Sequence, residues 1–275
     1  MNLVNKAEVK ADTATVNKRV QNIKDVFYNI PSALEISQLL KESGVAYSEL
    51  YPSNPMNVSK YSSQKGQSLN LGIYATDLSY AGIYEQKEEA MMYLTCANRL
   101  ATSLGIPDAF NENTISRINA NIDNEDSLLD IITEDYWNTD AYLKNSDRQE
   151  ISAYIMAGGW IEGLYIATQI ASHSSGNGEL LNRVAEQKLS LNELSALIDT
   201  YPEDAGIQGI KNKLKKLKDA YSDVGIKDSK MKVSTDTTSN TSTLGGEEKV
   251  LMTPEQFKNI AIVTAMVRNE IIMEY

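Results

Sequence analysis

One long stretch of the chain is almost free of charge, and it restricts the possible folds more than any other feature. Between Gly66 and Tyr84 the only charged residue is Asp77. On a helix, Ile73, Asp77 and Tyr80 would share one face, and the opposite face is also apolar or small. A helix that is apolar all round is buried on most sides, so we expect Asp77 to lie in the interior. An unpaired buried carboxylate is costly, which predicts a partner for it.

A second segment, residues 151–172, is equally apolar and has Glu162 as its single charged residue. Three glycines lie around Trp160 in this expected helix, and each mid-helix glycine costs about 1 kcal/mol relative to alanine. We therefore expect the close approach of a neighbouring helix or of a ligand. A membrane span is a third possibility, because Gly159 and Gly163 form a GxxxG pair. The polar residues of the segment, Glu162 among them, argue against it.

The last apolar segment should form a helix that begins after Thr253 and reaches nearly to Tyr275, with Arg268 inside it. The simplest interpretation is that the three apolar segments are the central helices. Arg268 would then neutralise Asp77 or Glu162, and nearby tyrosines would supply further hydroxyl groups.

Two functional interpretations of the same residues stay open. Aromatic faces and carboxylates together suit a pocket for a small polar or cationic ligand. Alternatively, Asp77 or Glu162 could act as the general acid or base of an enzyme. No catalytic or metal-binding residue is assigned. The candidate ligand-binding residues are Tyr74, Asp77, Tyr80, Tyr84, Trp160, Glu162, Tyr165 and Arg268.

Helical periodicity recurs along the chain and predicts an all-α protein, a bundle or array of about eight helices. Residues 1–10 are hydrophilic and are expected to be a disordered tether before a single helical domain over residues 11–275. Residues 45–65 are expected to form a long irregular connection. Residues 229–249 are expected to form a Ser/Thr-rich loop or a small β-hairpin at Gly245–Gly246. The expected helices cover residues 11–28, 31–44, 67–104, 113–122, 126–145, 148–172, 179–199, 203–222 and 253–275.

The charge balance argues against nucleic acid as a partner. With a net charge of −11 and a pI near 4.7, the chain would be repelled by that polyanion. One basic run, residues 211–218, could touch anionic lipid or nucleic acid. However, Leu214 and Leu217 continue an apolar stripe there, so we interpret the lysines as its solvated face. Cys96 is the only cysteine, which excludes an intrachain disulfide, and we expect it to be a small core residue.

Several chemistries lack the residues that they need. His173 is the only histidine, which excludes a helical di-iron site and argues against a zinc site of the usual His and Cys kind. No G-x-S-x-G elbow and no P-loop lysine pattern occurs. His173 follows a long apolar helix and is expected to lie at its polar end. These absences argue against an enzyme and against a cofactor.

Three stretches of the chain resemble one protein family. They read "FYNIPSALEISQLLKESG" at residues 27–44, "VSKYSSQKGQSLNLGIYATDLSYAGIYEQ" at 58–86 and "YIMAGGWIEGLYIA" at 154–167, so the resemblance covers roughly residues 20–175. They are similar to uncharacterised helical lipoproteins of the Bacteroidota cell envelope, a group without an established activity. The resemblance implies an exported protein tethered by an N-terminal lipid. The chain shows no signal peptide and no lipid-accepting cysteine near Met1, so we expect that such an anchor was removed.

Together these observations predict a non-catalytic, extracytoplasmic helical protein that acts as a binding or scaffold module of the cell envelope. Its partner would be an unidentified small molecule or envelope protein, and no transmembrane helix is expected. A small-molecule binder predicts a cavity that reaches solvent beside Asp77 and Glu162. An interaction module predicts instead a filled core and an exposed apolar patch, for instance over residues 45–65. An enzyme predicts a raised carboxyl pKa in a cleft.

Overall fold

The computed structural model describes residues 45–106, 111–122, 124–173, 178–201, 205–225, 232–236, 241–245 and 252–275. Three predictions lie outside these described residues. They are the tether over residues 1–10 and the helices over residues 11–28 and 31–44.

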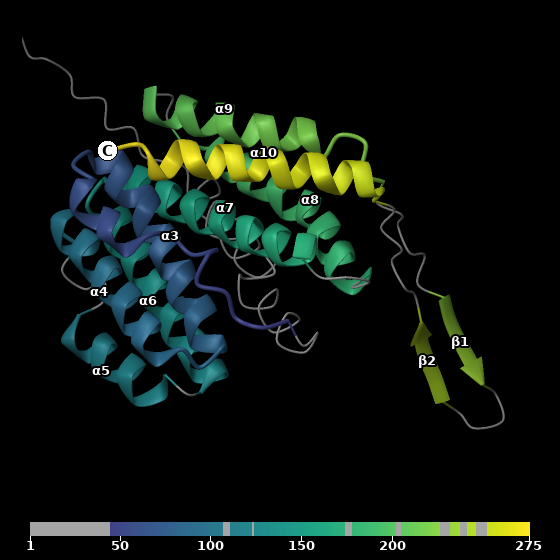
Figure 1. Ribbon diagram of the computed structural model, residues 1–275, viewed down its shortest axis with the longest axis horizontal. Helices are drawn as coiled ribbons and strands as arrows, with labels where there is room; N and C mark the ends of the chain where they lie inside the picture. Colours follow the sequence, from purple (N-terminus) through teal and green to yellow (C-terminus); the bar gives the residue numbers. More distant parts are fainter. Residues whose placement is uncertain are drawn as a thin grey trace, which may run out of the picture.

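Helices dominate the described residues, which confirms the prediction of an all-α multi-helix array (Figure 1). A short 3₁₀ helix, η1 (Pro55–Lys60), precedes them, and one antiparallel pair of strands, β1 (Lys232–Asp236) and β2 (Thr241–Gly245), comes before the last helix. The α-helices are α3 (Gln64–Ile83), α4 (Lys87–Ser103), α5 (Glu112–Asn121), α6 (Glu125–Asn145), α7 (Gln149–His173), α8 (Gly178–Ile198), α9 (Ala205–Ala220) and α10 (Pro254–Ile272).

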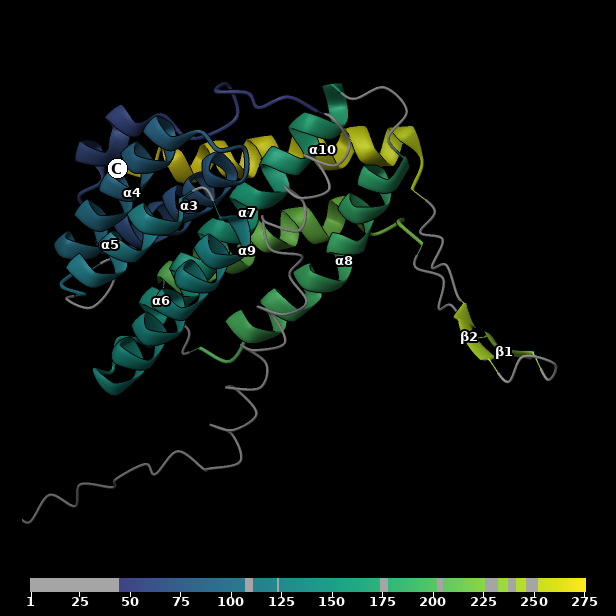
Figure 2. The same ribbon diagram turned by 90° about the horizontal axis from the view of Figure 1, so that it is seen from below.

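Helices α3 and α7 pack against each other at the centre of the molecule (Figures 1 and 2). Both sequences are apolar all round, and nearly every residue of both helices is buried. One hydrophobic core joins α7 to α8, α9 and α10, whereas a second joins α3 to α4, α5 and α6. Residues of α3 also lie in the first core, and residues of α7 also lie in the second. The central pair of helices therefore contributes to both cores, as the near absence of charge in its two segments predicted.

The glycines of the central helices allow the two backbones to touch. A Cβ atom on Gly72 would lie 1.9 Å from the carbonyl oxygen of Ile155, and one on Gly158 would lie 2.0 Å from that of Leu69. No side chain fits at either position, so these glycines are required by helix packing. Of the two explanations expected for the glycines around Trp160, the close approach of a neighbouring helix is the one observed at Gly158.

The prediction of a single helix over residues 67–104 is wrong, because the chain reverses between α3 and α4. Glu85 has a φ of 58°, in the left-handed region, and the N–H of Gln86 donates to the carbonyl of Ala81 over 2.9 Å. This is the hydrogen-bonding pattern that closes many helices, usually with glycine in the left-handed position. Here the position holds glutamate, so the sequence carries no recognisable stop signal.

Two irregular regions contain more structure than expected. The connection over residues 45–65 includes η1, and α3 already begins at Gln64. The hairpin exists, but its turn does not lie at Gly245–Gly246. Gly245 pairs with Lys232 and therefore belongs to strand β2.

The basic run at residues 211–218 lies on α9 and has an apolar underside. Leu214 and Leu217 are buried, as the apolar stripe predicted. On the other side, Lys216 forms an ion pair with Glu270 of α10, with 2.6 Å between Nζ and Oε1. Part of this positive charge is therefore neutralised within the protein.

Candidate functional site

Glu162 and Arg268 form a buried ion pair between α7 and α10. The Arg268 Nε and Nη2 atoms donate to the two carboxylate oxygens of Glu162, each over 2.8 Å. The side chain of Glu162 is fully buried, and Arg268 is only 6% exposed. Burial acts to lower the pKa of the Arg268 guanidinium, but the charge of Glu162 outweighs it, so the net pKa is raised and the guanidinium stays charged.

The same guanidinium lies against an aromatic ring and reaches the backbone. Its carbon Cζ is 4.6 Å from the centroid of the Tyr165 ring, a distance at which a cation and a ring face attract each other. Arg268 Nη2 also donates to the carbonyl of Tyr51 over 3.4 Å. Arg268 thus joins α10 to α7 and to the connection that precedes η1.

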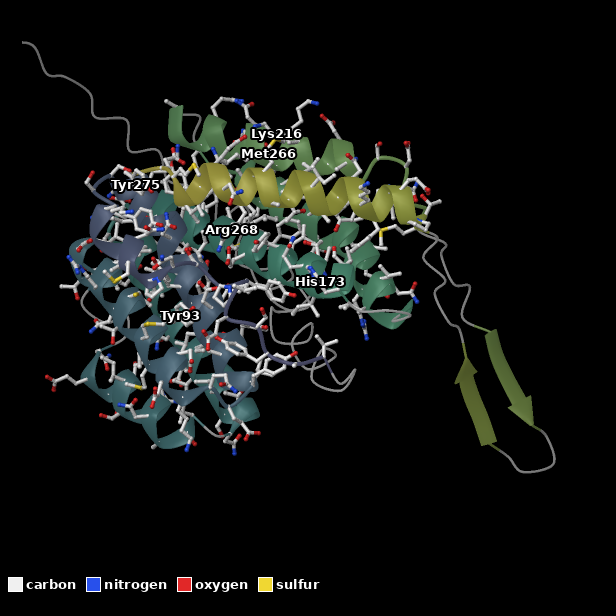
Figure 3. The ribbon with its side chains drawn as sticks, in the orientation of Figure 1. Tyr93, His173, Lys216, Met266, Arg268 and Tyr275 are labelled. Carbon is white, nitrogen blue, oxygen red and sulfur yellow. The ribbon has the colours of Figure 1, made fainter. Side chains whose placement is uncertain are left out.

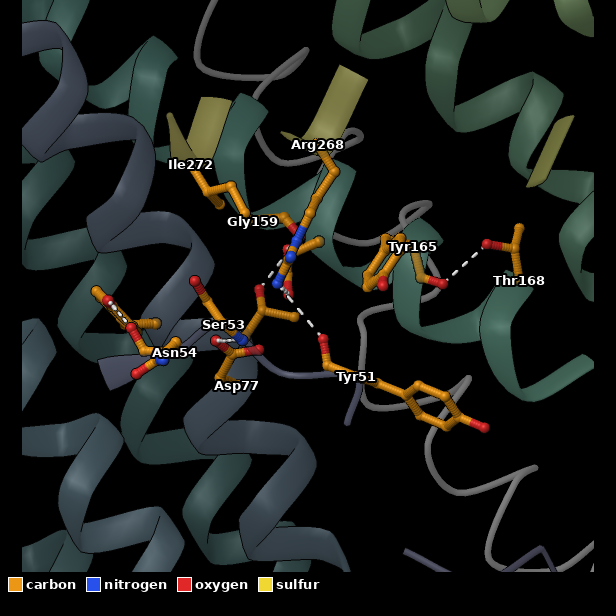
Figure 4. A network of polar contacts seen from close by, with 12 residues as sticks. Tyr51, Ser53, Asn54, Asp77, Gly159, Tyr165, Thr168, Arg268 and Ile272 are labelled. Atoms are coloured by element: carbon orange, nitrogen blue, oxygen red, sulfur yellow. Dashed lines mark hydrogen bonds and ion pairs between the residues drawn. The ribbon is translucent and has the colours of Figure 1, made fainter. Parts of the chain in front are cut away.

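Asp77 lies beside this pair and is fully buried. Its Oδ2 accepts a hydrogen bond from the N–H of Ser53 over 3.0 Å (Figure 4), whereas Oδ1 has no hydrogen-bond partner among the described residues. Burial raises the pKa of the Asp77 carboxyl well above its usual range. The charge of Glu162 raises it further, although Arg268 and the Ser53 N–H act in the opposite direction. The surroundings therefore favour the protonated, uncharged form of Asp77.

Residues 45–61, which we call the strap, are bound by side chains of α3. The hydroxyl of Tyr74 donates to the carbonyl of Asn54 over 3.0 Å, and the N–H of Ser48 donates to the hydroxyl of Tyr80 over 3.1 Å. We had expected these tyrosine hydroxyls near the buried charges. Their observed partners are backbone groups of the strap, because an irregular segment leaves such groups without partners of its own.

A cluster of three tyrosine rings lies at the C-terminal end of α3. The ring of Tyr80 is 5.0 Å from that of Tyr47 and 5.2 Å from that of Tyr84, measured between centroids. The hydroxyls of Tyr47 and Tyr84 are buried and have no partner among the described residues. Burial raises the pKa of Tyr80 to about 12 and raises those of the other two as well, so all three stay uncharged near neutral pH.

Trp160 does not lie in a polar environment. It is buried in the core that joins α7 to α8, α9 and α10, and its indole N–H has no partner among the described residues. The eight predicted site residues therefore divide into three groups. Asp77, Glu162, Tyr165 and Arg268 come together at the buried charges, Tyr74, Tyr80 and Tyr84 bind the strap or one another, and Trp160 packs in the core.

Sequence reasoning missed the contributions of the strap. Tyr51 and Ser53 contact the buried charges through a carbonyl and an N–H, and backbone groups carry no residue-specific signal. Another buried carboxylate, Asp140 of α6, was also missed. It accepts a hydrogen bond from Ser152 of α7 over 2.6 Å and pairs with Lys144. Its spacing of four residues from Lys144 is typical of a surface pair, so no pattern distinguished it.

A surface groove of about 390 Å³ lies between the last turns of α7 and the first half of α10. None of the eight predicted site residues lines it. Its walls are formed by Gln169, Ser172, Phe257, Lys258, Ala261, Ile262 and Ala265.

The single histidine and the single cysteine of the chain both contact the strap. His173 is the last residue of α7, as expected, and its Nδ1 lies 2.7 Å from the carbonyl oxygen of Gln169 and 3.3 Å from the hydroxyl of Tyr51. Cys96 is buried, and its Sγ contacts the carbonyl of Pro55 in the strap over 3.8 Å. Burial raises the pKa of the Cys96 thiol to about 11.

The chain matches no protein-family model, no curated protein and no solved structure. Within the described residues, no three His, Cys, Asp or Glu side chains gather where they could hold a metal ion. No helix in the described part of the chain has both the length and the apolar character needed to cross a membrane.

Proposed function

We propose that the protein is a non-catalytic binding or scaffold module of a cell envelope, and that it recognises a partner protein through the groove between α7 and α10. One observation carries this proposal. The central charges pair with one another inside the protein, whereas apolar side chains of α10 face solvent beside the groove. Ile262 is 57% exposed and Met266 is 46% exposed. Met266 is labelled on α10 in Figure 3. Exposed apolar side chains at a hollow in the surface are typical of interaction sites.

The chemistry of the groove supports a particular kind of partner. Phe257, Ala261 and Ala265 provide apolar lining, and Lys258 adds a positive charge. No acid among the described residues pairs with Lys258, whereas Lys213 and Lys216 of α9 pair with acids of α10. Such a groove fits an amphipathic helix whose apolar face enters it and whose acidic residue lies opposite Lys258.

The assignment to the cell envelope rests on the resemblance described for residues 27–44, 58–86 and 154–167. Envelope lipoproteins are exported and tethered, so the partner would be another protein of the same compartment. An anchored module with a docking groove would hold that partner at the membrane surface.

The small-molecule and enzyme hypotheses draw less support from the geometry. A ligand pocket would need Asp77, Glu162 and the tyrosines to face a cavity, but their described contacts are with one another and with the strap. The raised pKa of Asp77 suits a general acid. However, its carboxyl is fully buried, so a substrate could reach it only after the strap had moved.

Peptide binding tests the proposal. The probes are two fluorescent amphipathic helical peptides that differ only in carrying Glu or Lys beside a leucine stripe, and the readout is fluorescence anisotropy. We expect the wild type to prefer the Glu peptide. Ile262→Glu should weaken that binding at least about tenfold, or 1.4 kcal/mol, because it places a charge against the apolar groove. Lys258→Glu should reverse the preference.

Leu189→Glu provides the matched control. Leu189 lies on α8, away from the groove, and is 45% exposed, so the same substitution there should leave peptide binding unchanged. The proposal fails if neither peptide binds, or if Ile262→Glu and Leu189→Glu have equal effects.

A further inference from the structure

The buried charges at the centre of the protein do not balance if every group is ionised. Glu162 and Asp77 are two carboxyl groups, and Arg268 is the guanidinium that faces them. Both oxygens of Glu162 are already engaged by Arg268. Asp77 is therefore left with the N–H of Ser53 as its described donor, and this neutral group cannot offset a buried negative charge.

Within the part of the chain that the structure describes, the other titratable groups around Asp77 do not supply the missing positive charge. Each is a tyrosine or a cysteine whose pKa is raised by burial, so each is neutral at physiological pH. They come from the strap, α3, α4 and α7, and are Tyr47, Tyr74, Tyr80, Tyr93, Cys96 and Tyr165.

We propose that Asp77 holds a proton in the folded protein, and that this proton keeps the strap closed over the centre of the protein. A protonated Asp77 is uncharged, and its Oδ2 still accepts a hydrogen bond from the N–H of Ser53. The set of Asp77, Glu162 and Arg268 is then neutral. An ionised Asp77 would instead be a fully buried negative charge without a cation of its own, which is costly.

The strap lies directly on the Asp77 carboxyl and is held there by side chains of α3. On another side of α3, the backbone of α7 is in direct contact at Gly72. Ser53 is itself only 1% exposed, and its N–H lies on the Asp77 carboxyl. A second negative charge needs solvation, so loss of the proton favours lifting of the strap and breaks the contacts of Ser53 and Tyr51 together.

Cys96 reports this opening, because it is the only cysteine of the chain and lies under Pro55 of the strap. The experiment compares the rate at which dithiodipyridine modifies Cys96 in the wild type and in Asp77→Asn. An asparagine mimics the protonated aspartate, since its N–H₂ donates and its oxygen accepts, but it cannot ionise. At each pH the ratio of the two rates removes the thiol ionisation that the two proteins have in common. A charged Asp77 raises the pKa of the Cys96 thiol, so its direct effect would slow the wild type and oppose the increase expected from opening.

We expect the ratio of wild-type to Asp77→Asn rates to rise with pH above about pH 4, by up to about tenfold per pH unit, until Asp77 in the closed state has lost its proton. Asp223→Asn, which changes an exposed acid, should keep a constant ratio to the wild type. A constant ratio for Asp77→Asn would overturn the proposal. Failure of Asp77→Asn to fold would overturn it as well, because the neutral isostere should preserve every contact of the protonated form.

Discussion

At the scale of single residues, one arginine holds together three parts of the molecule. Arg268 binds Glu162 through two parallel hydrogen bonds, lies over the ring of Tyr165 and donates to the carbonyl of Tyr51. A buried pair of this kind contributes little net stability, but the loss of one partner leaves a buried charge alone. Its role is to fix how α10 packs on α7 and how the strap lies on both.

Removing one partner of the ion pair should lower the stability of the protein more than removing both partners. Glu162→Gln should lower the free energy of unfolding by about 3–5 kcal/mol, because Arg268 stays buried and charged. The double variant Glu162→Gln with Arg268→Met should recover part of this loss, since no buried charge remains. Urea unfolding followed by circular dichroism measures both values. If the double variant is less stable than Glu162→Gln, the uncompensated charge of Arg268 is not the cause of the stability lost in Glu162→Gln.

Some of these residue contacts followed from the sequence. The isolated charges of Asp77 and Glu162 in apolar segments predicted that Arg268 would pair with one of them, and the pair with Glu162 is observed. The tyrosines near these charges were assigned less well. Spacing on a helix gives the direction of a side chain, but it cannot show that Tyr74 and Tyr80 bind the backbone of a distant segment of the chain.

At the scale of elements, the contact between α3 and α7 depends on missing side chains. The two backbones can approach this closely because a glycine of one helix faces a backbone carbonyl of the other, at Gly72 and at Gly158. A single methyl group there would meet a carbonyl oxygen of the neighbouring helix, which cannot move aside as a flexible side chain can.

Alanine substitutions should therefore have opposite effects at two helical glycines. Gly158→Ala should destabilise the protein by about 1–3 kcal/mol or more, because its Cβ would overlap the carbonyl of Leu69. Gly209→Ala on α9 should stabilise it by about 0.5–1 kcal/mol through helix propensity, since the nearest atom, Lys65 Nζ, is 3.5 Å away. Thermal unfolding measures both. A stabilising Gly158→Ala would show that the two helices can separate at no cost.

The sequence predicted where helices occur better than it predicted the residues at which the chain turns. Apolar periodicity located α5 to α10 to within a few residues, because each helix buries a continuous face. The reversal at Glu85 was missed, since any residue can be forced into the left-handed region when the following contacts require it. The hairpin turn was misplaced for a related reason: the Gly245–Gly246 pair resembles a turn, but register decides where the strands meet.

At the scale of the whole molecule, two hydrophobic cores share the central helices, and their buried charges are sealed by the strap. An interior arranged in this way leaves recognition to the surface, where α10 exposes Ile262 and Met266 beside the groove. The same helix supplies Arg268 to the centre. A partner on the outer face of α10 would therefore bind a helix whose position is fixed by the charges below it.

The most direct test of a structural role for the buried acids is the pH dependence of unfolding in the wild type and in Asp77→Asn. The folded protein raises the pKa of Asp77 above its unfolded value, so the stability contributed by this group is complete below about pH 4 and is lost as the pH rises. The asparagine of the variant does not titrate. In urea unfolding, the free energy of unfolding of Asp77→Asn should therefore increase relative to that of the wild type as the pH rises, by up to about 1.4 kcal/mol per pH unit. If the wild type instead becomes more stable relative to Asp77→Asn as the pH rises, the folded protein needs Asp77 charged. That result would contradict the account of Asp77 as a protonated, structural residue.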